Sequence, residues 1–307
     1  AERQGQTIFG DLNTAFMTDG AWLHVPAGVS VDEPIHLLFL ATQSGVSVHL
    51  RNVLVADAGA HATVIEHYLG ADGAAYFTNA VTQIFTADAA GIEHYKLQQE
   101  SLQAFHVAGI HAQQKKDSKL ESHSVSLGAG MARNDITTTF IETGCEVTLN
   151  GLYLTDGRQH VDNHTRVDHV APSGTSEEYY RGVLDGSSHA VFNGKVIVHR
   201  DAQKTKAQQT NHNLLLSRNA EVDTKPQLEI FADDVECTHG ATVGQIDETQ
   251  LFYLRTRGID EATAHKLLVH AFAHHVIERI RVQSLRERLE KILMARLPQD
   301  DSVQELA

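Results

Sequence analysis

Most of the first 250 residues form short segments in which apolar and polar residues alternate. In residues 46–55 (VSVHLRNVLV), apolar side chains fall at positions 46, 48 and 50 and then at 53 and 55, and residues 147–154 (VTLNGLYL) follow a similar pattern. A period of two in segments rich in Val, Ile, Thr and Tyr predicts β-strands. Before Leu254, almost no segment has the 3.6-residue period of an amphipathic helix.

Short turns built from small residues separate the predicted strands and recur along the chain: ADAGA (56–60), ADAAG (87–91), LGAGMA (127–132), ETGCE (142–146), DGSSHA (185–190) and SRNAE (217–221). Loose repeats of strand and turn at this spacing favour a β-helix, a solenoid in which like residues stack. We therefore predict a mainly β chain with a lead-in (1–30) and a β-helix core (31–254). A sandwich of Greek-key sheets is the alternative, because spacing alone does not exclude it, and the irregular repeat does not fix the number of turns.

The last fifth of the chain follows a different pattern. Residues 251–254 (LFYL) indicate a last strand or a linker, and residues 255–258 (RTRG) end it. Asp260 is a good N-cap for the broad amphipathic segment that follows, so we predict a helix at roughly 260–280.

A second helix is predicted from Ser284, which forms the capping box S-x-x-E with Glu287. We assign residues 255–307 to a C-terminal helical domain. A pair of helices cannot form a large core alone, so this domain must cap the β-helix, bind a partner, or do both.

Composition excludes several classes of protein. The formal net charge is −14, and the one short basic run, at residues 115–119, is explained by a solvated turn, so a broad nucleic-acid surface is not expected. The sequence has no apolar run near the 18–20 residues of a membrane span and no signal peptide, so we expect no membrane partner. Its two cysteines, far apart in sequence, indicate reduced thiols and a cytoplasmic protein.

Sequence motifs give no support for an enzyme. A phosphate-binding G-x-x-x-x-G-K-[ST] loop, a G-x-S-x-G elbow and a dinucleotide fingerprint at a strand–helix junction are all missing. A carbohydrate-active β-helix enzyme is the alternative, and it would need clustered carboxylates. Asp185, Asp223 and Glu229 show no such arrangement, and an acidic protein suits a polyanionic substrate poorly. We predict that the chain is not an enzyme by itself.

Cys237 and His239 form the C-x-H pair of the segment KPQLEIFADDVECTHGATVGQID (225–247). In a strand, residues two apart share one face, so a thiol and an imidazole would lie side by side. Both groups ligate soft or borderline metals. A buried cysteine beside a hydrogen-bonded histidine is the other interpretation, and one cysteine and one histidine cannot hold a cluster alone.

Other histidines and polar residues have simpler interpretations. His270 and His274 lie four residues apart on the first predicted helix, with Glu278 one turn on; this spacing can hold zinc, but a helix face at a protein interface explains it as well. The stretch QHVDNHTRVDH (159–169) indicates a polar loop. The polar residues of 193–225 indicate, for the most part, the solvated face of a sheet; they are Asn193, Lys195, His199, Lys204, Lys206, Gln208, Gln209, Asn211, Asn213, Asp223 and Lys225.

From about Asp162 onward, the sequence resembles the SufB/SufD family of iron–sulfur cluster assembly scaffolds. The segments that carry the resemblance are DNHTRVDH (162–169), HAVFNGKVIVHRDAQKTKAQQTNHNLLLS (189–217), AEVDTKPQLEIFADDVECTHGATVGQIDE (220–248) and QLFYLRTRGI (250–259). Residues 1–160 match the family more in their general pattern than in specific sequence motifs. The form V-x-C-T-H-G-A-T-V-G is more similar to the SufD branch than to the SufB branch.

This resemblance implies a right-handed parallel β-helix followed by a C-terminal helical domain. It also implies a partner of the SufB type at the β-helix end and the SufC ABC-type ATPase on the terminal helices. His239 matches a histidine implicated at the cluster site of the SufB interface, and Cys237 matches the cysteine of the same motif. A cluster would then be transient and shared with SufB, with none bound stably by the chain alone. An isolated chain could pair with itself through the same strand edges.

Overall fold

The computed structural model describes residues 7–296, which form two parallel β-sheets and four helices. The odd-numbered strands form one sheet, in the order β1 (Trp22–Val25), β3 (Ser47–Ala56), β5 (Phe77–Thr86), β7 (Phe105–Gln114), β9 (Met131–Phe140), β11 (His160–His169), β13 (His189–Val198) and β15 (Glu221–Ile230). The even-numbered strands form the other, in the order β2 (Ile35–Ala41), β4 (His61–Gly70), β6 (Gly91–Gln99), β8 (Lys119–Ser126), β10 (Glu146–Thr155), β12 (Thr175–Leu184), β14 (Thr205–Leu215) and β16 (Val235–Gly244).

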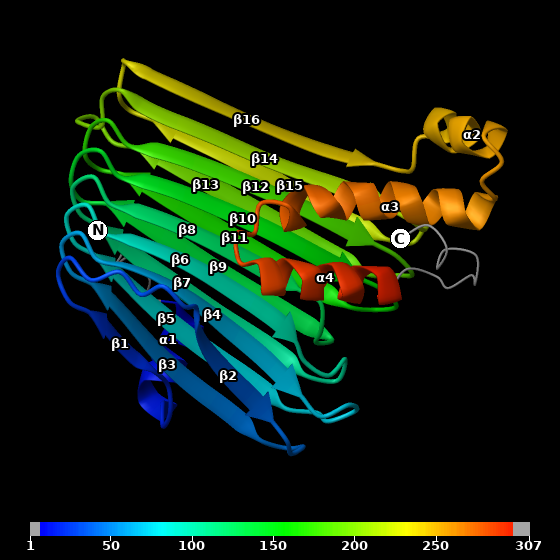
Figure 1. Cartoon of the computed structure of the whole chain (residues 1–307), viewed down its shortest axis with the longest axis horizontal. Helices are drawn as coiled ribbons and strands as arrows, with labels where there is room; N and C mark the ends of the chain where they lie inside the picture. The colour runs from blue at the N-terminus through cyan, green and yellow to red at the C-terminus, as the bar shows by residue number, and fades with distance from the viewer. Residues whose placement is uncertain (1–6, 297–307) are drawn as a thin grey trace.

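This arrangement is a parallel β-solenoid of eight turns, because successive strands alternate between the two sheets and pair with the strand two places on (Figure 1). Paired residues in neighbouring turns lie 26 residues apart at Phe105 and Met131 and 32 apart at His189 and Glu221. The prediction of a mainly β solenoid with terminal helices is confirmed. The Greek-key alternative is wrong, since every strand pair within residues 7–296 is parallel.

The corners explain why small residues recur in the sequence. Gly59, in the predicted turn 56–60, has a φ of 67°, a left-handed conformation that costs glycine little. Its amide donates to the carbonyl oxygen of Asp88 in the corner of the next turn, at 2.9 Å. Stacked corners therefore continue the hydrogen-bond ladders of the sheets from turn to turn.

The core lies between the sheets, where every second residue of each strand points inward. Fully buried Leu54 and Ile84 are typical, and each such side chain contributes roughly 1.5–3 kcal/mol by leaving water. Large and small residues alternate between turns: Gly151 stacks on Tyr180, and Tyr153 stacks on Gly182. A Cβ on Gly151 would lie 2.0 Å from the Tyr180 ring, so the tyrosine fits only over a glycine.

Four helices flank the solenoid. They are α1 (Ile8–Phe16), α2 (Glu248–Thr256), α3 (Glu261–Ile277) and α4 (Gln283–Arg296). The α3–α4 hairpin covers the outer face of the even-numbered sheet (Figure 1), where Val269 and Val276 pack with Val125, Leu152 and Val183. The helical pair therefore covers a side of the solenoid and leaves its end open. Among residues 7–296, no helix is both long enough and apolar enough to span a membrane.

Two local predictions near the C-terminus are wrong. Residues 251–254 were expected as a strand or linker, but they belong to α2, which Asp247 caps by accepting a hydrogen bond from the Thr249 amide at 2.8 Å. An aromatic-rich run of four residues is too short for its periodicity to separate a strand from a helix. Ser284 lies inside α4, which already begins at Gln283, so the predicted capping box does not start this helix. The part of the predicted C-terminal helical domain at 297–307 lies outside the described residues.

Candidate metal-ligand site at the open end of the solenoid

Cys237 and His239 lie on β16, the last strand of the even-numbered sheet. Parallel pairing places Cys237 beside Ala207 of β14 and His239 beside Gln209. Ala207 and Gln209 both point into the core and are buried, so the two residues of β16 point the same way. The prediction that Cys237 and His239 share one face of a strand is confirmed, and that face is the interior of the solenoid.

The end of the solenoid exposes this inward face. Strands β15 and β16 are the last of their sheets, and within residues 7–296 no further turn covers them. Inward residues that are buried in earlier turns are therefore only partly buried here, and they include Val222, Leu228 and Val235 beside Cys237. The end of the molecule that carries the C-x-H pair is an apolar surface bordered by two unpaired strand edges.

The Cys237 thiol is half-buried and packs against the core. Burial raises its pKa above the usual value, although a hydrogen bond from the Ala207 backbone opposes the shift. The thiol is therefore protonated at neutral pH, and binding to a metal would release its proton.

The His239 side chain is exposed and makes no hydrogen bond or ion pair with any residue in the range 7–296. Histidines with buried rings, by contrast, have partners inside the protein; His169, for example, lies 2.9 Å from the Ser176 hydroxyl. An imidazole that projects from an uncovered end with no internal partner is available to ligate a metal or to contact another chain.

A buried polar chain lies directly beneath His239. Gln209 donates through Nε2 to Glu178 Oε1 at 3.1 Å, and Glu178 accepts a short hydrogen bond from the Thr165 hydroxyl. The Gln209 Oε1 atom is buried without a hydrogen-bond partner among the described residues. Burial raises the pKa of Glu178 to about 7, with the hydrogen bonds from Thr165 and Gln209 opposing the shift.

The sequence did not predict this series of buried, hydrogen-bonded polar side chains. Gln209, Asn211 and Asn213 were assigned to a solvated face, but all three point inward and are buried. Glu178 was not singled out, because its place beneath Gln209 depends on pairing between residues about 30 positions apart. The alternation of β14 itself was the available signal, since Ala207 and Leu215 fix which parity faces the core.

The other histidine-rich segments form no closed site with Cys237 and His239. Residues 159–169 belong largely to β11 and are not a loop, as the sequence suggested, so their side chains alternate between faces. His164 and Asp162 point outward and lie 2.8 Å apart, while His169 is buried in the interior. His270 and His274 contact Glu290 of α4.

The second cysteine is structural. Cys145 is fully buried at a corner, where its thiol donates to the carbonyl oxygens of Lys115 at 3.0 Å and Glu142 at 3.1 Å. Burial raises its pKa to about 11. Such a thiol is inert and does not contribute to the site on β16.

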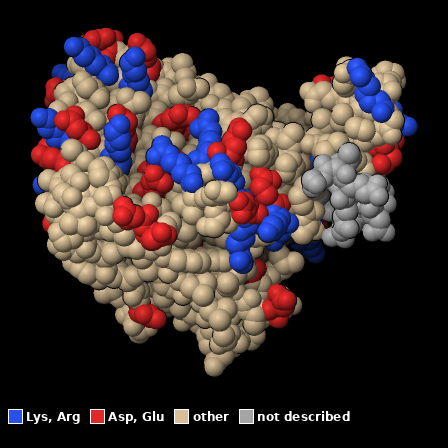
Figure 2. Space-filling model, in the orientation of Figure 1, with Lys and Arg blue, Asp and Glu red and all other residues tan. Residues whose placement is uncertain are grey.

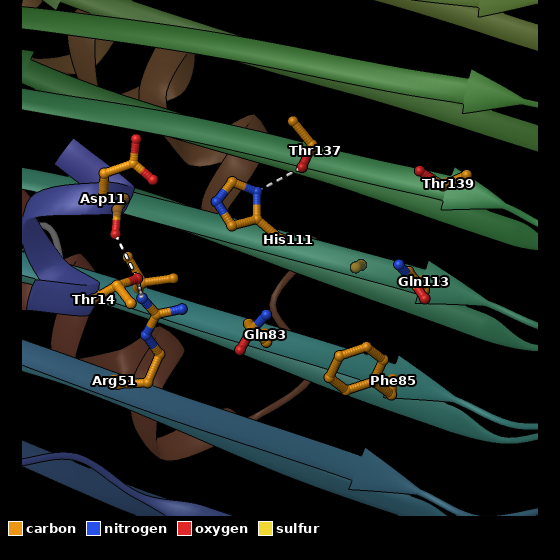
Figure 3. A pocket seen from close by; sticks show the side chains of 12 residues that line it. Asp11, Thr14, Arg51, Gln83, Phe85, His111, Gln113, Thr137 and Thr139 are labelled. Atoms are coloured by element: carbon orange, nitrogen blue, oxygen red, sulfur yellow. Dashed lines mark hydrogen bonds between the residues drawn. The ribbon is translucent and has the colours of Figure 1, made fainter. Parts of the chain in front are cut away.

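A polar groove lies on the opposite, outer side of the odd-numbered sheet, beside α1 (Figure 3). Arg51 of β3 donates there to the Thr14 hydroxyl of α1 at 2.6 Å, and His111 of β7 lies 2.7 Å from the Thr137 hydroxyl. The Arg51 contact attaches α1 to the sheet, whereas the His111 contact joins β7 to β9. The groove faces away from the core and does not share the inward face of Cys237 and His239.

The carboxylates considered for a carbohydrate-active enzyme are dispersed. Asp223 and Glu229 lie on one strand, β15, six residues apart, which corresponds to about 20 Å. Each has its own partner, His189 at 2.9 Å and Lys195 at 2.8 Å. Pairs of catalytic carboxylates in glycosidases lie about 5–9.5 Å apart, so this pair cannot act together.

Figure 2 shows acidic and basic side chains intermixed on the helix-covered face.

Comparison with known proteins identifies the family to which the chain is similar. The family described as SUF system FeS cluster assembly, SufBD core domain, matches residues 39–272. An iron–sulfur cluster assembly SufBD family protein of Synechocystis sp. is 36% identical over 303 residues, which cover 95% of this chain and 67% of the relative. The iron–sulfur cluster assembly protein SufD of Escherichia coli is 38% identical over 295 residues, which cover 95% of this chain and 70% of the relative.

Proposed function

Because the chain belongs to the SufBD core family and thus has a role in SUF-type iron–sulfur cluster assembly, we propose that it is a SufD-type scaffold subunit without catalytic activity of its own. In this proposal, the open end of the solenoid pairs with SufB, and His239, with Cys237, supplies half of a site for a nascent cluster or for entering iron. The C-terminal helices bind the SufC ATPase.

The observation that carries the proposal is the uncovered last turn. Among residues 7–296, no strand pairs with the outer edges of β15 and β16, and the unpaired backbone N–H and C=O groups of such edges seek partner strands. The partly exposed apolar residues Val222, Leu228 and Val235 add hydrophobic surface to the same end. A partner that covers this end would bury His239 within the contact.

One imidazole and one thiol fit half of a shared cluster site. Neutral histidine is a competent iron ligand, as in Rieske centres, where two histidines replace two cysteines. A cluster needs further ligands, which would come from the SufB side. The cluster is then cargo of the complex, formed transiently between the chains, and neither Cys237 nor His239 holds it alone.

The surface proposed for SufC includes α2, which stands off the solenoid beyond the ends of the strands (Figure 1). Its Phe252 and Tyr253 side chains are 69% and 56% exposed, which is unusual for adjacent aromatic residues. Only Leu251 of this helix is buried. An exposed aromatic pair on a projecting helix suits a hot spot for a partner.

The connection between α2 and β16 suggests how ATP binding would act on the site. Only residues 245–247 separate the end of β16 from the start of α2. If SufC dimerises on binding ATP, a displacement of α2 would pull on the strand that carries His239. We propose that this movement loosens the contact with SufB and opens the shared site to iron or sulfur.

Pull-down of the chain with SufB and SufC tests the assignment of partners. The double variant Phe252→Ala/Tyr253→Ala should lose at least about tenfold in SufC affinity, because hot-spot aromatics contribute 2 kcal/mol or more. It should still bind SufB. Phe105→Ala, which removes an exposed phenylalanine from the solenoid, is the matched control and should bind both partners. Unchanged SufC binding by the double variant would refute the role of α2, and failure of the wild-type chain to bind SufB would refute the pairing.

A further inference from the structure

Two histidines of α3 and one glutamate of α4 converge between the two helices. His270 Nε2 lies 2.7 Å from Glu290 Oε2, and His274 Nδ1 lies 2.5 Å from Glu290 Oε1. The two imidazole rings stack with their centroids 5.6 Å apart. One ligand atom from each residue lies within 4.8 Å of the other two.

We propose that His270, His274 and Glu290 bind a divalent first-row transition-metal ion such as Zn²⁺ or Fe²⁺. Two imidazoles and one carboxylate are the ligand set of the facial-triad iron sites, and His₂Glu also serves catalytic zinc sites that keep an open position. Histidine nitrogen ligands disfavour Mg²⁺ and Ca²⁺, which prefer oxygen. This site goes beyond the proposed cluster half-site and does not depend on it.

The backbone already holds the three side chains in place for an ion. His270 and His274 are four residues apart on one helix, so they lie on one face, and Glu290 approaches that face from the facing helix. Two ligands that are both about 2.0–2.1 Å from a tetrahedral ion lie roughly 3.4 Å from each other. An ion would therefore have to widen the observed nitrogen–oxygen contacts by less than about 1 Å.

Protonation and access also fit metal binding. Neutral His274 that ligates through Nδ1 carries its proton on Nε2, which lies 3.9 Å from Glu278 Oε2. This separation is too long for a hydrogen bond, so Glu278, which the sequence suggested as a ligand, lies beside the site without holding the ring. All three ligand side chains are partly exposed, so an ion can enter from solvent and keep water as a further ligand.

A bound ion would join α3 to α4 by coordination. These helices cover the outer face of the even-numbered sheet, and α2, the proposed contact for the ATPase, packs against α3. Metal occupancy would therefore stiffen the hairpin from which α2 projects.

Titration of the chain with Co²⁺ tests the site, because Co²⁺ reports bound nitrogen ligands through its visible absorption. The host is the Cys237→Ala/His239→Ala variant, in which the proposed cluster half-site cannot contribute. We expect one equivalent of Co²⁺ to bind, Zn²⁺ to displace it, and Mg²⁺ to leave it in place. Zn²⁺ should also raise the melting temperature of the host.

His270→Gln and Glu290→Gln, each made in the host, should weaken Co²⁺ binding by about 100-fold or more, since loss of an outer-shell partner alone costs about 10–100-fold. His275→Gln is the matched control: His275 neighbours His274 but contacts Glu278, and its loss should change the affinity less than about threefold. Circular dichroism verifies that each variant is folded. Absence of Co²⁺ binding by the host, or equal binding by the host and Glu290→Gln, would overturn the proposal.

Discussion

His94 and His239 occupy the same inward-facing column of the even-numbered sheet, five strands apart, in opposite surroundings. The column runs from His94 through Ser122, Leu149, Glu178 and Gln209 to His239. His94 is fully buried; its Nδ1 lies 3.1 Å from the Ser122 hydroxyl and its Nε2 lies 3.3 Å from a carboxylate oxygen of Glu66. His239 is exposed and has no partner within residues 7–296.

The difference shows that strand pairing fixes whether a side chain points into the solenoid. The turn in which the side chain lies then decides whether it is buried or available for binding. In the middle turns, most inward polar groups have a partner inside the protein, because a buried polar group without one is costly. At the last turn, the same inward orientation leaves the group facing solvent or another chain. The same residue type is structural in one turn and available for binding in another.

Breaking the buried polar network around His94 should have the largest effect. Glu66 accepts hydrogen bonds from the Thr82 hydroxyl at 2.6 Å and the Tyr68 hydroxyl at 2.8 Å. Burial alone would raise its pKa, but the charge of His94 and these hydrogen bonds lower it to about 2. Glu66→Ala should reduce the free energy of unfolding by about 3–5 kcal/mol, because its partners remain buried and unpaired.

Urea unfolding measures this loss, with His239→Ala as the comparison. Since His239 is exposed and unpaired, its replacement should change the free energy of unfolding by less than about 0.5 kcal/mol. Similar losses for the two variants would refute the contrast between the middle turns and the last.

Glu178, two strands before His239, should give the solenoid a pH-dependent stability. Its pKa is near 7 in the folded chain and 4.5 in the reference state, so folding favours its protonated form. Stability is then fully present below pH 4.5 and falls as the pH rises to 7, by about 3 kcal/mol in total.

Glu178→Gln should remove this dependence, so its urea midpoint should change less between pH 5 and pH 8 than that of the wild type. Glu177→Gln is the control, because Glu177 points outward and pairs with Arg279 at 2.6 Å. It should keep the pH dependence of the wild type. An unchanged slope in Glu178→Gln would show that Glu178 is not the titrating group.

The two cysteines offer the mildest test of the same contrast. Cys237 in the last turn should react with iodoacetamide in the folded chain, whereas Cys145 should react only after local or global opening, on the order of 100-fold more slowly. Peptide mass spectrometry reads the two rates separately. Bound SufB should slow Cys237 alone, and faster modification of Cys145 would contradict the assignment of the two environments.

Much of the fold was predictable because its signals are local. Alternation identified the strands, small residues identified the corners, and a spacing of two placed Cys237 and His239 on one face. What failed depends on contacts across turns. Glu178 lies beneath Gln209 only because β12 pairs with β14, and Glu290 reaches His270 only because α4 folds back onto α3.

The choice between a strand and a helix at residues 251–254 could not be made from four residues. Asp247 caps the helix, and Leu251 is its one buried residue. In sequence, its exposed pair of aromatic residues resembles part of a β-strand. The uncovered end was expected only from the family resemblance, since exposure of β16 depends on where the stack of turns ends.

Cluster assembly by the complete complex tests the central claim most directly. The chain, SufB and SufC are combined with iron and a sulfur donor, and cluster formation is followed by its visible absorption for the wild type, His239→Ala and the control His212→Ala, whose side chain points outward from β14. We predict that all three chains pair with SufB, that His212→Ala assembles clusters like the wild type, and that His239→Ala forms few or none. Undiminished cluster formation by a fully paired His239→Ala complex would contradict the proposed role of the last turn.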